Sequence, residues 1–148
     1  MMIWKDAVFN ALDTQKLFED DAHRSRFKEL TDCYSGAAFF TKGLCKCMYL
    51  SSWDDEHFLL MLDMLNQLSL KANMNLADMH EHGELMAEEK VDYENHVMLL
   101  SCAFLMNEPF DETSLPDDME PEGRHIIRRA LEAAAIIDGV TKAECTPS

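Results

Sequence analysis

The chain has 148 residues, of which 47% are apolar and 28% charged, and its formal net charge is −15. This length fits one domain with a hydrophobic core, which excludes a wholly disordered chain, and the charge argues against direct binding to nucleic acid or an anionic membrane. Val, Ile and Thr are scarce beside Leu, Met, Ala and Glu. That balance favours helices, because unbranched side chains lose little rotamer freedom in a helix.

The first part of the chain has apolar residues at helical spacing. Ile3, Ala7 and Ala11 follow one another at intervals of four residues and predict a short first helix. Asp13 or Thr14 is expected to cap the N-terminus of the second helix. Ser35-Gly36 then interrupts the pattern.

The next two helices contain five of the seven residues that are expected in the shared core. Residues 36–50 are apolar on nearly every side, which predicts the most buried helix, with Lys42 and Lys46 forming a narrow strip that faces water. Ser52 and Asp55 have the spacing of a capping box and predict the start of a long helix. Seven large residues are expected in the shared core: Phe39, Phe40, Leu44, Leu62, Leu65, Val97 and Leu100.

Helical spacing continues after a turn at residues 73–75, with Gly83 as a candidate break between a short helix and a long one. Residues 107–123 contain three prolines, seven acids and no base, which predicts a long acidic loop that is functional or mobile. Pro121 suits the first turn of a last helix, and Gly139 is a plausible left-handed cap at its end. The sequence therefore predicts an all-α fold. Residues 1–140 should form a single-domain bundle of five to six helices, and residues 141–148 a flexible C-terminal tail.

The acidic residues are concentrated in one part of the chain. Residues 72–123 contain fourteen acids and one base, Lys90. Carboxylates placed about 5.4 Å apart per helical turn resemble the dense charge of a nucleic-acid strand. They suit binding to a basic protein surface, although solvation alone and divalent cation binding remain alternatives. The predicted partner-binding residues are Glu81, Glu84, Glu88, Asp92, Asp111, Glu112, Asp117, Asp118 and Glu120.

The nearest match to a metal site is formed by His80, His82 and Glu84. His80 and Glu84 are four residues apart and share a helix face, whereas His80 and His82 diverge by about 200°. The usual ligand spacings are missing, so no metal or cofactor is expected. Cys102 and His96 supply the residue types of a nucleophilic site, but Cys102 lies in an apolar run that predicts a packed thiol. We therefore expect no catalytic residues.

The cysteines and the hydropathy bear on the location of the protein. The five cysteines are odd in number and form no C-x-x-C, which favours reduced thiols in the cytoplasm. The apolar runs are shorter than a membrane span, and the N-terminus does not resemble a signal peptide.

Three segments carry a family resemblance. They are the stretch with Leu17-Phe18, His23, Arg26-Phe27 and Glu29-Leu30, the buried helix ending in Met48-Tyr49-Leu50-Ser51, and residues 96–107. Together they resemble small helical proteins of unknown function encoded by phages and mobile elements of gut Firmicutes. The resemblance implies a mobile-element setting, in which small acidic proteins include inhibitors of host defence such as anti-CRISPR and anti-restriction proteins. The family offers no catalytic residues.

These observations lead to one functional hypothesis and two alternatives. The hypothesis is a non-catalytic protein that binds a basic protein surface, most concretely a phage-encoded inhibitor that mimics nucleic acid in the channel of a host factor such as a CRISPR effector. One alternative is a helical-bundle metal-binding protein or enzyme that uses His80, His82 and Glu84. The other is a structural or oligomeric interaction module, including a homodimer, in which the acidity serves only solubility.

Overall fold

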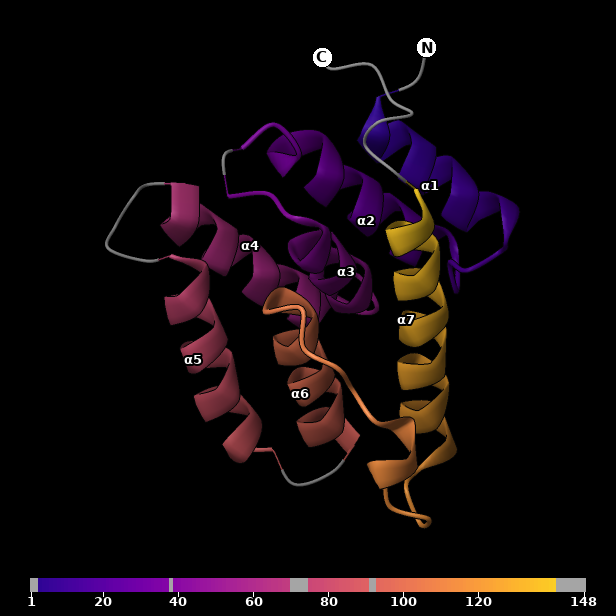
Figure 1. Cartoon of the computed structure of the whole chain (residues 1–148), viewed down its shortest axis with the longest axis vertical. Coiled ribbons are helices and arrows are strands. Elements are labelled where there is room, and N and C mark those ends of the chain that lie inside the picture. Colours follow the sequence, from indigo (N-terminus) through magenta and orange to yellow (C-terminus); the bar gives the residue numbers. More distant parts are fainter. Residues whose placement is uncertain (1–2, 38, 70–74, 91–92, 141–148) are drawn as a thin grey trace.

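The computed structural model describes residues 3–37, 39–69, 75–90 and 93–140, and within these ranges the regular structure is helical without a β-strand. The predicted all-α fold is thus confirmed, although the described residues form seven α-helices rather than five to six (Figure 1). The helices are α1 (Trp4–Thr14), α2 (Asp21–Tyr34), α3 (Lys42–Ser51), α4 (Asp55–Ser69), α5 (Leu76–Glu88), α6 (Tyr93–Leu105) and α7 (Pro121–Gly139). A short 3₁₀-helix, η1 (Glu112–Ser114), lies in the segment before α7.

Helix α3 is the centre of the bundle and packs against α2, α4, α6 and α7. Every residue from Leu44 to Leu50 is buried, as expected for a helix that is apolar on nearly every side. The helix begins later than predicted, because Thr41 rather than Gly36 precedes it and accepts a hydrogen bond from the Leu44 backbone at 3.0 Å. A Cβ atom on Gly43 would lie 2.3 Å from the carbonyl oxygen of Phe104, so glycine lets α3 and α6 approach closely.

The prediction that Lys42 and Lys46 form a strip facing water is wrong for Lys46. That residue is only 7% exposed, and its Nζ lies 2.9 Å from the carboxylate of Asp138. Lys42 donates from the same side to the carbonyl oxygen of Asp138 at 3.4 Å. The end of α7 therefore covers the polar strip of α3, which a local helical pattern does not reveal.

Three predicted helix ends are also wrong. Asp20, rather than Asp13 or Thr14, caps α2 by accepting a hydrogen bond from the His23 backbone at 2.8 Å. Ser52 is buried at the C-terminal end of α3, where its hydroxyl donates to the carbonyl of Met48 at 2.6 Å. Gly139 belongs to the last turn of α7, and no described glycine has a positive φ.

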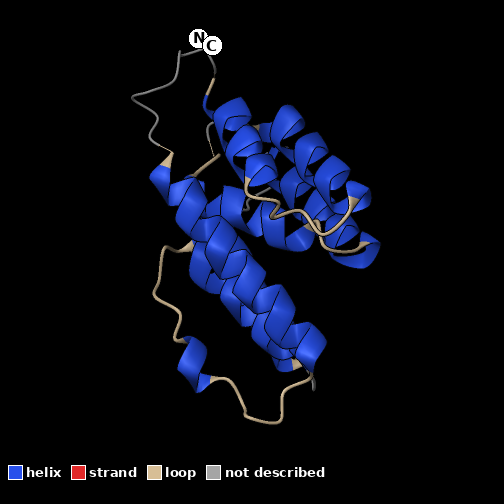
Figure 2. Ribbon diagram, turned by 90° about the vertical axis from the view of Figure 1, so that its right-hand side faces the viewer, coloured by secondary structure: helices blue, strands red, loops and turns tan. Residues whose placement is uncertain are grey.

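Helix α5 runs through Gly83 without a break. A Cβ atom on Gly83 would lie 2.9 Å from Sγ of Cys102, so this glycine marks a close approach between α5 and α6. The helix begins with a capping box in which Asn75 and Asp78 accept hydrogen bonds from each other's backbone. Its main neighbour is α6, and the two helices lie side by side (Figures 1 and 2).

The core agrees with the predicted set for the most part. Five predicted residues are buried, and the other two, Phe39 and Leu62, pack against the core while remaining partly exposed. The indole of Trp4 donates to the carbonyl oxygen of Val140 at 2.8 Å, which joins the start of α1 to the end of α7. The predicted tail at residues 141–148 lies outside the described residues.

Candidate functional site

Helix α5 carries part of the predicted acidic surface. Glu81, Glu84 and Glu88 are exposed, while Met79 on the opposite side of the helix is buried. The remaining predicted residue of this region, Asp92, lies outside the described residues. The amphipathic pattern of α5 thus points three carboxylates into solvent.

The segment between α6 and α7 carries the rest, and its residues Asp111, Glu112, Asp117, Asp118 and Glu120 are all exposed. Two of them also stabilise the segment. Asp111 accepts hydrogen bonds from the backbone and the hydroxyl of Thr113 at 2.9 and 2.6 Å, and this hydroxyl bond lowers the pKa of its carboxyl. Glu112 lies 3.5 Å from Nε of Arg128 on α7. The predicted loop is therefore partly ordered by its own carboxylates.

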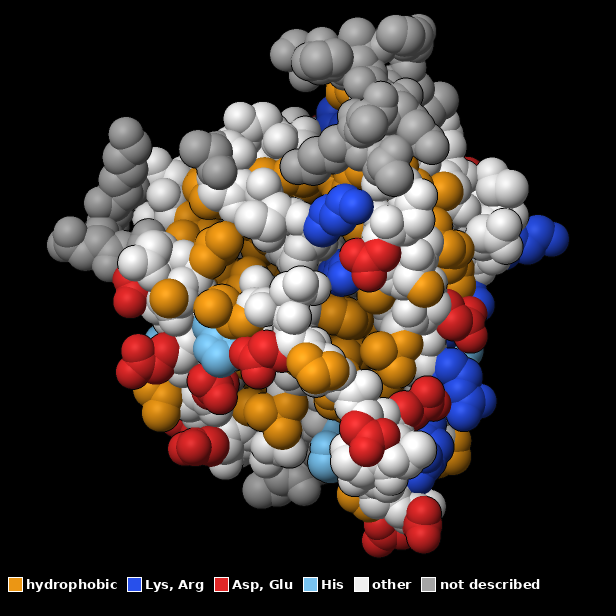
Figure 3. Space-filling model, in the orientation of Figure 1, with side chains coloured by type: hydrophobic (Ala, Val, Ile, Leu, Met, Phe, Trp, Pro, Cys, Tyr) orange, Lys and Arg blue, Asp and Glu red, His pale blue; other side chains and the backbone are white. Residues whose placement is uncertain are grey.

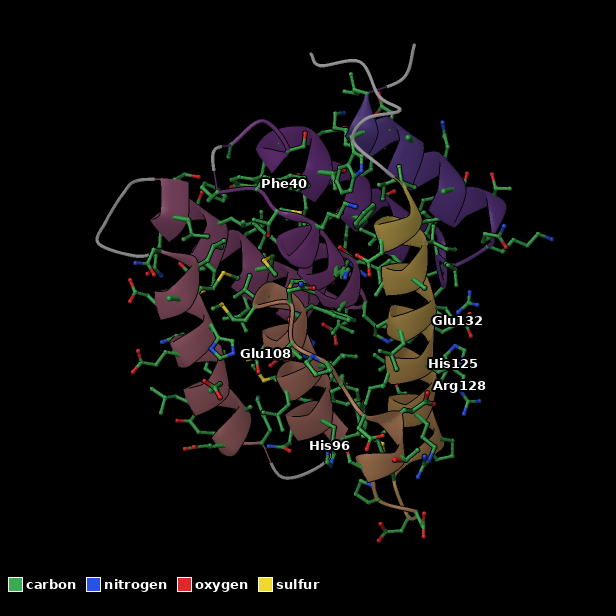
Figure 4. All side chains as sticks on the ribbon, viewed as in Figure 1. Phe40, His96, Glu108, His125, Arg128 and Glu132 are labelled. Atoms are coloured by element: carbon green, nitrogen blue, oxygen red, sulfur yellow. The ribbon has the colours of Figure 1, made fainter. Side chains whose placement is uncertain are left out.

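His80, one of the three residues of the alternative metal site, connects the two acidic regions. Nδ1 of His80 lies 3.2 Å from Glu84, and Nε2 lies 3.4 Å from Glu108 at the start of the loop. Glu108, labelled in Figure 4, was not among the predicted residues, because only the fold places it beside α5. His80 thus brings carboxylates from two elements together.

The charged side chains are segregated over the surface. Figure 3 shows acidic side chains over α5 and over the segment before α7 on one face, with basic side chains along α7. On α7, Arg129 and His125 both contact Glu19, at 3.2 and 3.0 Å. Among the described residues, six of the predicted acids form no ion pair: Glu81, Glu88, Asp111, Asp117, Asp118 and Glu120.

The residues of the alternative metal site and of the alternative nucleophilic site are not arranged for either chemistry within the described ranges. Across the described ranges, no group of three or more His, Cys, Asp and Glu side chains is placed to hold a metal ion. His82 is exposed and lies on the opposite side of α5 from His80. Burial raises the pKa of the Cys102 thiol to about 11 and that of Cys47 to about 12. Both thiols therefore stay protonated at neutral pH. A protonated thiol is a poor nucleophile, because the thiolate is the reactive form.

Residues of four helices, α3 to α6, line a partly open cavity of about 90 Å³. Seven of its lining residues contain sulfur, and sulfur atoms gather between α4, α5 and α6 in Figure 4. These residues are Cys47, Met61, Met64, Met79, Met86, Met98 and Cys102. The methionines of the lining come from three helices, α4, α5 and α6, and their convergence is a property of the fold that no local sequence pattern contains.

None of the helices within the described ranges is long and apolar enough to cross a membrane. Comparison of the chain with protein-family models, with curated proteins and with solved structures finds no match in any of the three.

Proposed function

We propose that the protein binds a strongly basic surface of another protein through its acidic face, defined as Glu81, Glu84 and Glu88 of α5 with Asp117, Asp118 and Glu120 of the following loop. One observation carries the proposal: exposed carboxylates from two separate elements lie on one face, and most have no ion-pair partner among the described residues. Such a face attracts cationic partners over a distance and relieves its own repulsion when they bind.

The concrete form of the proposal is an inhibitor that occupies the nucleic-acid channel of a host defence factor, such as a CRISPR effector. Its support is the sequence resemblance to phage and mobile-element proteins and the high charge density of the acidic face. Carboxylates on this face would meet the Lys and Arg side chains that otherwise contact phosphates. In that form, the protein displaces a nucleic acid without binding one.

The first experiment tests whether the location of the charge matters. The double variant Glu81→Lys/Glu88→Lys is compared with a control on α2, Asp21→Lys/Glu29→Lys, whose side chains are also exposed. Each variant changes the net charge from −15 to −11, because each of two substitutions adds two charges. The probe is a fluorescent oligolysine, with binding measured by anisotropy at about 50 and about 300 mM NaCl.

We expect the wild-type protein to bind the probe with an affinity that falls steeply with salt. The α5 variant should lose about tenfold or more in affinity, and the α2 control should lose much less. Equal losses in the two variants would show that only the net charge matters and would contradict the proposal. The inhibitor form is then tested by displacement of a labelled oligonucleotide from a purified CRISPR effector, which the α5 variant should fail to produce.

A further inference from the structure

One histidine lines the sulfur-lined cavity and has a ring nitrogen available for a ligand. Nδ1 of His57 lies 2.7 Å from the Asp54 carboxylate, which only accepts hydrogen bonds, so the neutral ring has its proton on Nδ1. Nε2 then has a lone pair, and no described residue forms a hydrogen bond with it. A carboxylate that holds the other ring nitrogen is the usual arrangement behind a histidine that binds a metal ion.

Methionine side chains from two helices line the same cavity. On α4, Met61 and Met64 follow His57 at intervals of four and seven residues, so the three side chains share one face of the helix. Met79 and Met86 of α5 are seven residues apart and also line the cavity. A thioether sulfur has no charge and can bind a soft metal ion without losing a proton. The cavity thus combines one imidazole with several thioethers.

This set of donors does not suit hard metal ions or zinc. The described lining residues include no Asp or Glu, which supply the oxygen ligands of Mg²⁺ and Ca²⁺. Zinc sites use thiolates, whereas the Cys47 thiol donates to the carbonyl of Ser101 at 3.1 Å and burial raises its pKa to about 12. Thioethers beside an imidazole instead favour Cu(I).

The charges around His57 also favour a cation. The histidine lines a second cavity of about 40 Å³ together with Asp54, Glu94 and Glu122. Neither cavity has a Lys or Arg among its described lining residues. Glu94 is paired with Lys90 at 3.4 Å, whereas Glu122 forms no ion pair with a described residue. Carboxylates on this side attract a cation, and Asp54 supplies a negative charge one ring away from the ion.

We propose that the sulfur-lined cavity binds a soft monovalent metal ion of the Cu(I) class. The ligands from α4 are Nε2 of His57 and the sulfur atoms of Met61 and Met64, and one methionine of α5, Met79 or Met86, completes the site. The inference departs from the sequence-based expectation that no metal is bound, because that expectation depended on the spacing of His, Cys and carboxylate ligands. It is independent of the proposed function, since no residue of the acidic face lines the cavity.

The test measures the affinity of the full-length protein for Cu(I). The metal is kept reduced with ascorbate in the absence of oxygen, and the protein competes for it with the coloured chelator bicinchoninate. All proteins carry Cys33→Ser, which removes an exposed thiol, and Cys145→Ser. We expect one Cu(I) per chain, with sulfur and nitrogen neighbours in X-ray absorption at the copper edge.

The main variant is Met61→Leu/Met64→Leu, which removes two sulfur atoms at nearly constant side-chain volume. It should weaken Cu(I) binding about tenfold or more, because two ligands are lost. The matched control is Met48→Leu/Met106→Leu, which also removes two sulfur atoms but changes methionines that do not line the cavity. The control should keep the affinity of the parent protein, and circular dichroism checks that both are folded.

Two further variants test the roles of the carboxylate and the thiols. Asp54→Asn retains a side chain that can cap α4 but removes the charge behind His57, so it should weaken binding about tenfold. Cys47→Ala/Cys102→Ala should leave the affinity unchanged, because neither thiol is a ligand in the proposed site.

Each other outcome overturns the inference. No binding of Cu(I), or equal affinity in the parent protein and the main variant, shows that the cavity is not a metal site. An equal loss in the methionine control shows that sulfur anywhere in the chain is sufficient, and a loss in the cysteine variant assigns the metal to the thiols. If the main variant does not fold, Met79→Leu and Met86→Leu provide the result, and at least one of them should weaken binding.

Discussion

His23 of α2 is a fully buried histidine whose two ring nitrogens both have hydrogen-bond partners. Nδ1 accepts from the Glu19 backbone at 3.1 Å, and Nε2 lies 2.9 Å from the carbonyl oxygen of Tyr49. Because a backbone N–H only donates and a carbonyl only accepts, this arrangement requires the neutral ring with its proton on Nε2. Burial lowers the pKa of His23 below its ordinary value of 6.5, because removal from water disfavours the charged ring.

This lowered pKa predicts that stability depends on pH. Below about pH 6.5 the unfolded chain binds a proton at His23 that the folded protein resists, so the free energy of unfolding should fall as the pH is lowered. The His23 contribution is fully present above that pH and is lost toward the lower folded pKa, with a slope of at most about 1.4 kcal/mol per pH unit.

The measurement is urea unfolding of the wild type and of His23→Gln between about pH 5 and pH 7. The variant should be less stable throughout but should have a shallower slope with pH. His82→Gln, which changes an exposed histidine, is the control and should retain the wild-type slope. A wild-type slope in His23→Gln would show that other groups cause the pH dependence.

At the scale of helices, the sequence predicted which segments are helical better than where they end. Helical spacing and composition placed the buried α3 and most of the core, because those signals depend on local order and burial. The ends depended on contacts that a local pattern does not contain. Glycine is a common helix breaker, yet Gly83 lies within α5, and its lack of a side chain lets α6 pack closely.

The same limit applies to the candidate site. The exposed acids of α5 and of the loop were predictable from charge and periodicity. The link from His80 to Glu108 and the cavity shared by four helices were not, because they arise from the packing of α5 on α6 and of α6 on α3.

Helix α5 should be less stable than the centre of the bundle. It has one main neighbour, and its first turn depends on the capping box of Asn75 and Asp78. Replacing Asn75 with Ala should destabilise this helix by about 1 kcal/mol, since one end loses its hydrogen-bond acceptor. The measurement is native-state hydrogen exchange, in which α5 amides should exchange faster than those of α3.

In Asn75→Ala the increase in exchange should be confined to α5 and its contact with α6. Asp20→Ala, which removes the cap of α2, provides a matched comparison because α2 contacts α3 directly. A uniform increase over all helices in Asn75→Ala would show that α5 unfolds only with the whole domain.

For the whole molecule, a net charge of −15 on 148 residues should reduce the stability of the folded state. Like charges on the acidic face repel each other, and salt screens exposed charges beyond a Debye length of about 8 Å at physiological ionic strength. The Tm should therefore rise by a few degrees between about 20 and about 200 mM NaCl.

The variant Glu81→Gln/Glu88→Gln lowers the magnitude of the net charge from 15 to 13 and should show a smaller rise. Differential scanning calorimetry measures both proteins. A fall in Tm with salt would mean that ion pairs such as the one between Arg129 and Glu19 outweigh the repulsion.

The hydrogen bond between Trp4 and Val140 has a practical consequence for how the protein is handled. It holds the two ends of the described chain together at one pole, whereas η1 lies at the opposite pole (Figures 1 and 2). A fluorophore attached to a residue near Trp4 or near Val140 therefore lies on the same side of the molecule, away from the loop that carries Asp117 and Asp118. Surface immobilisation through this pole of the molecule presents that part of the acidic face to the solution.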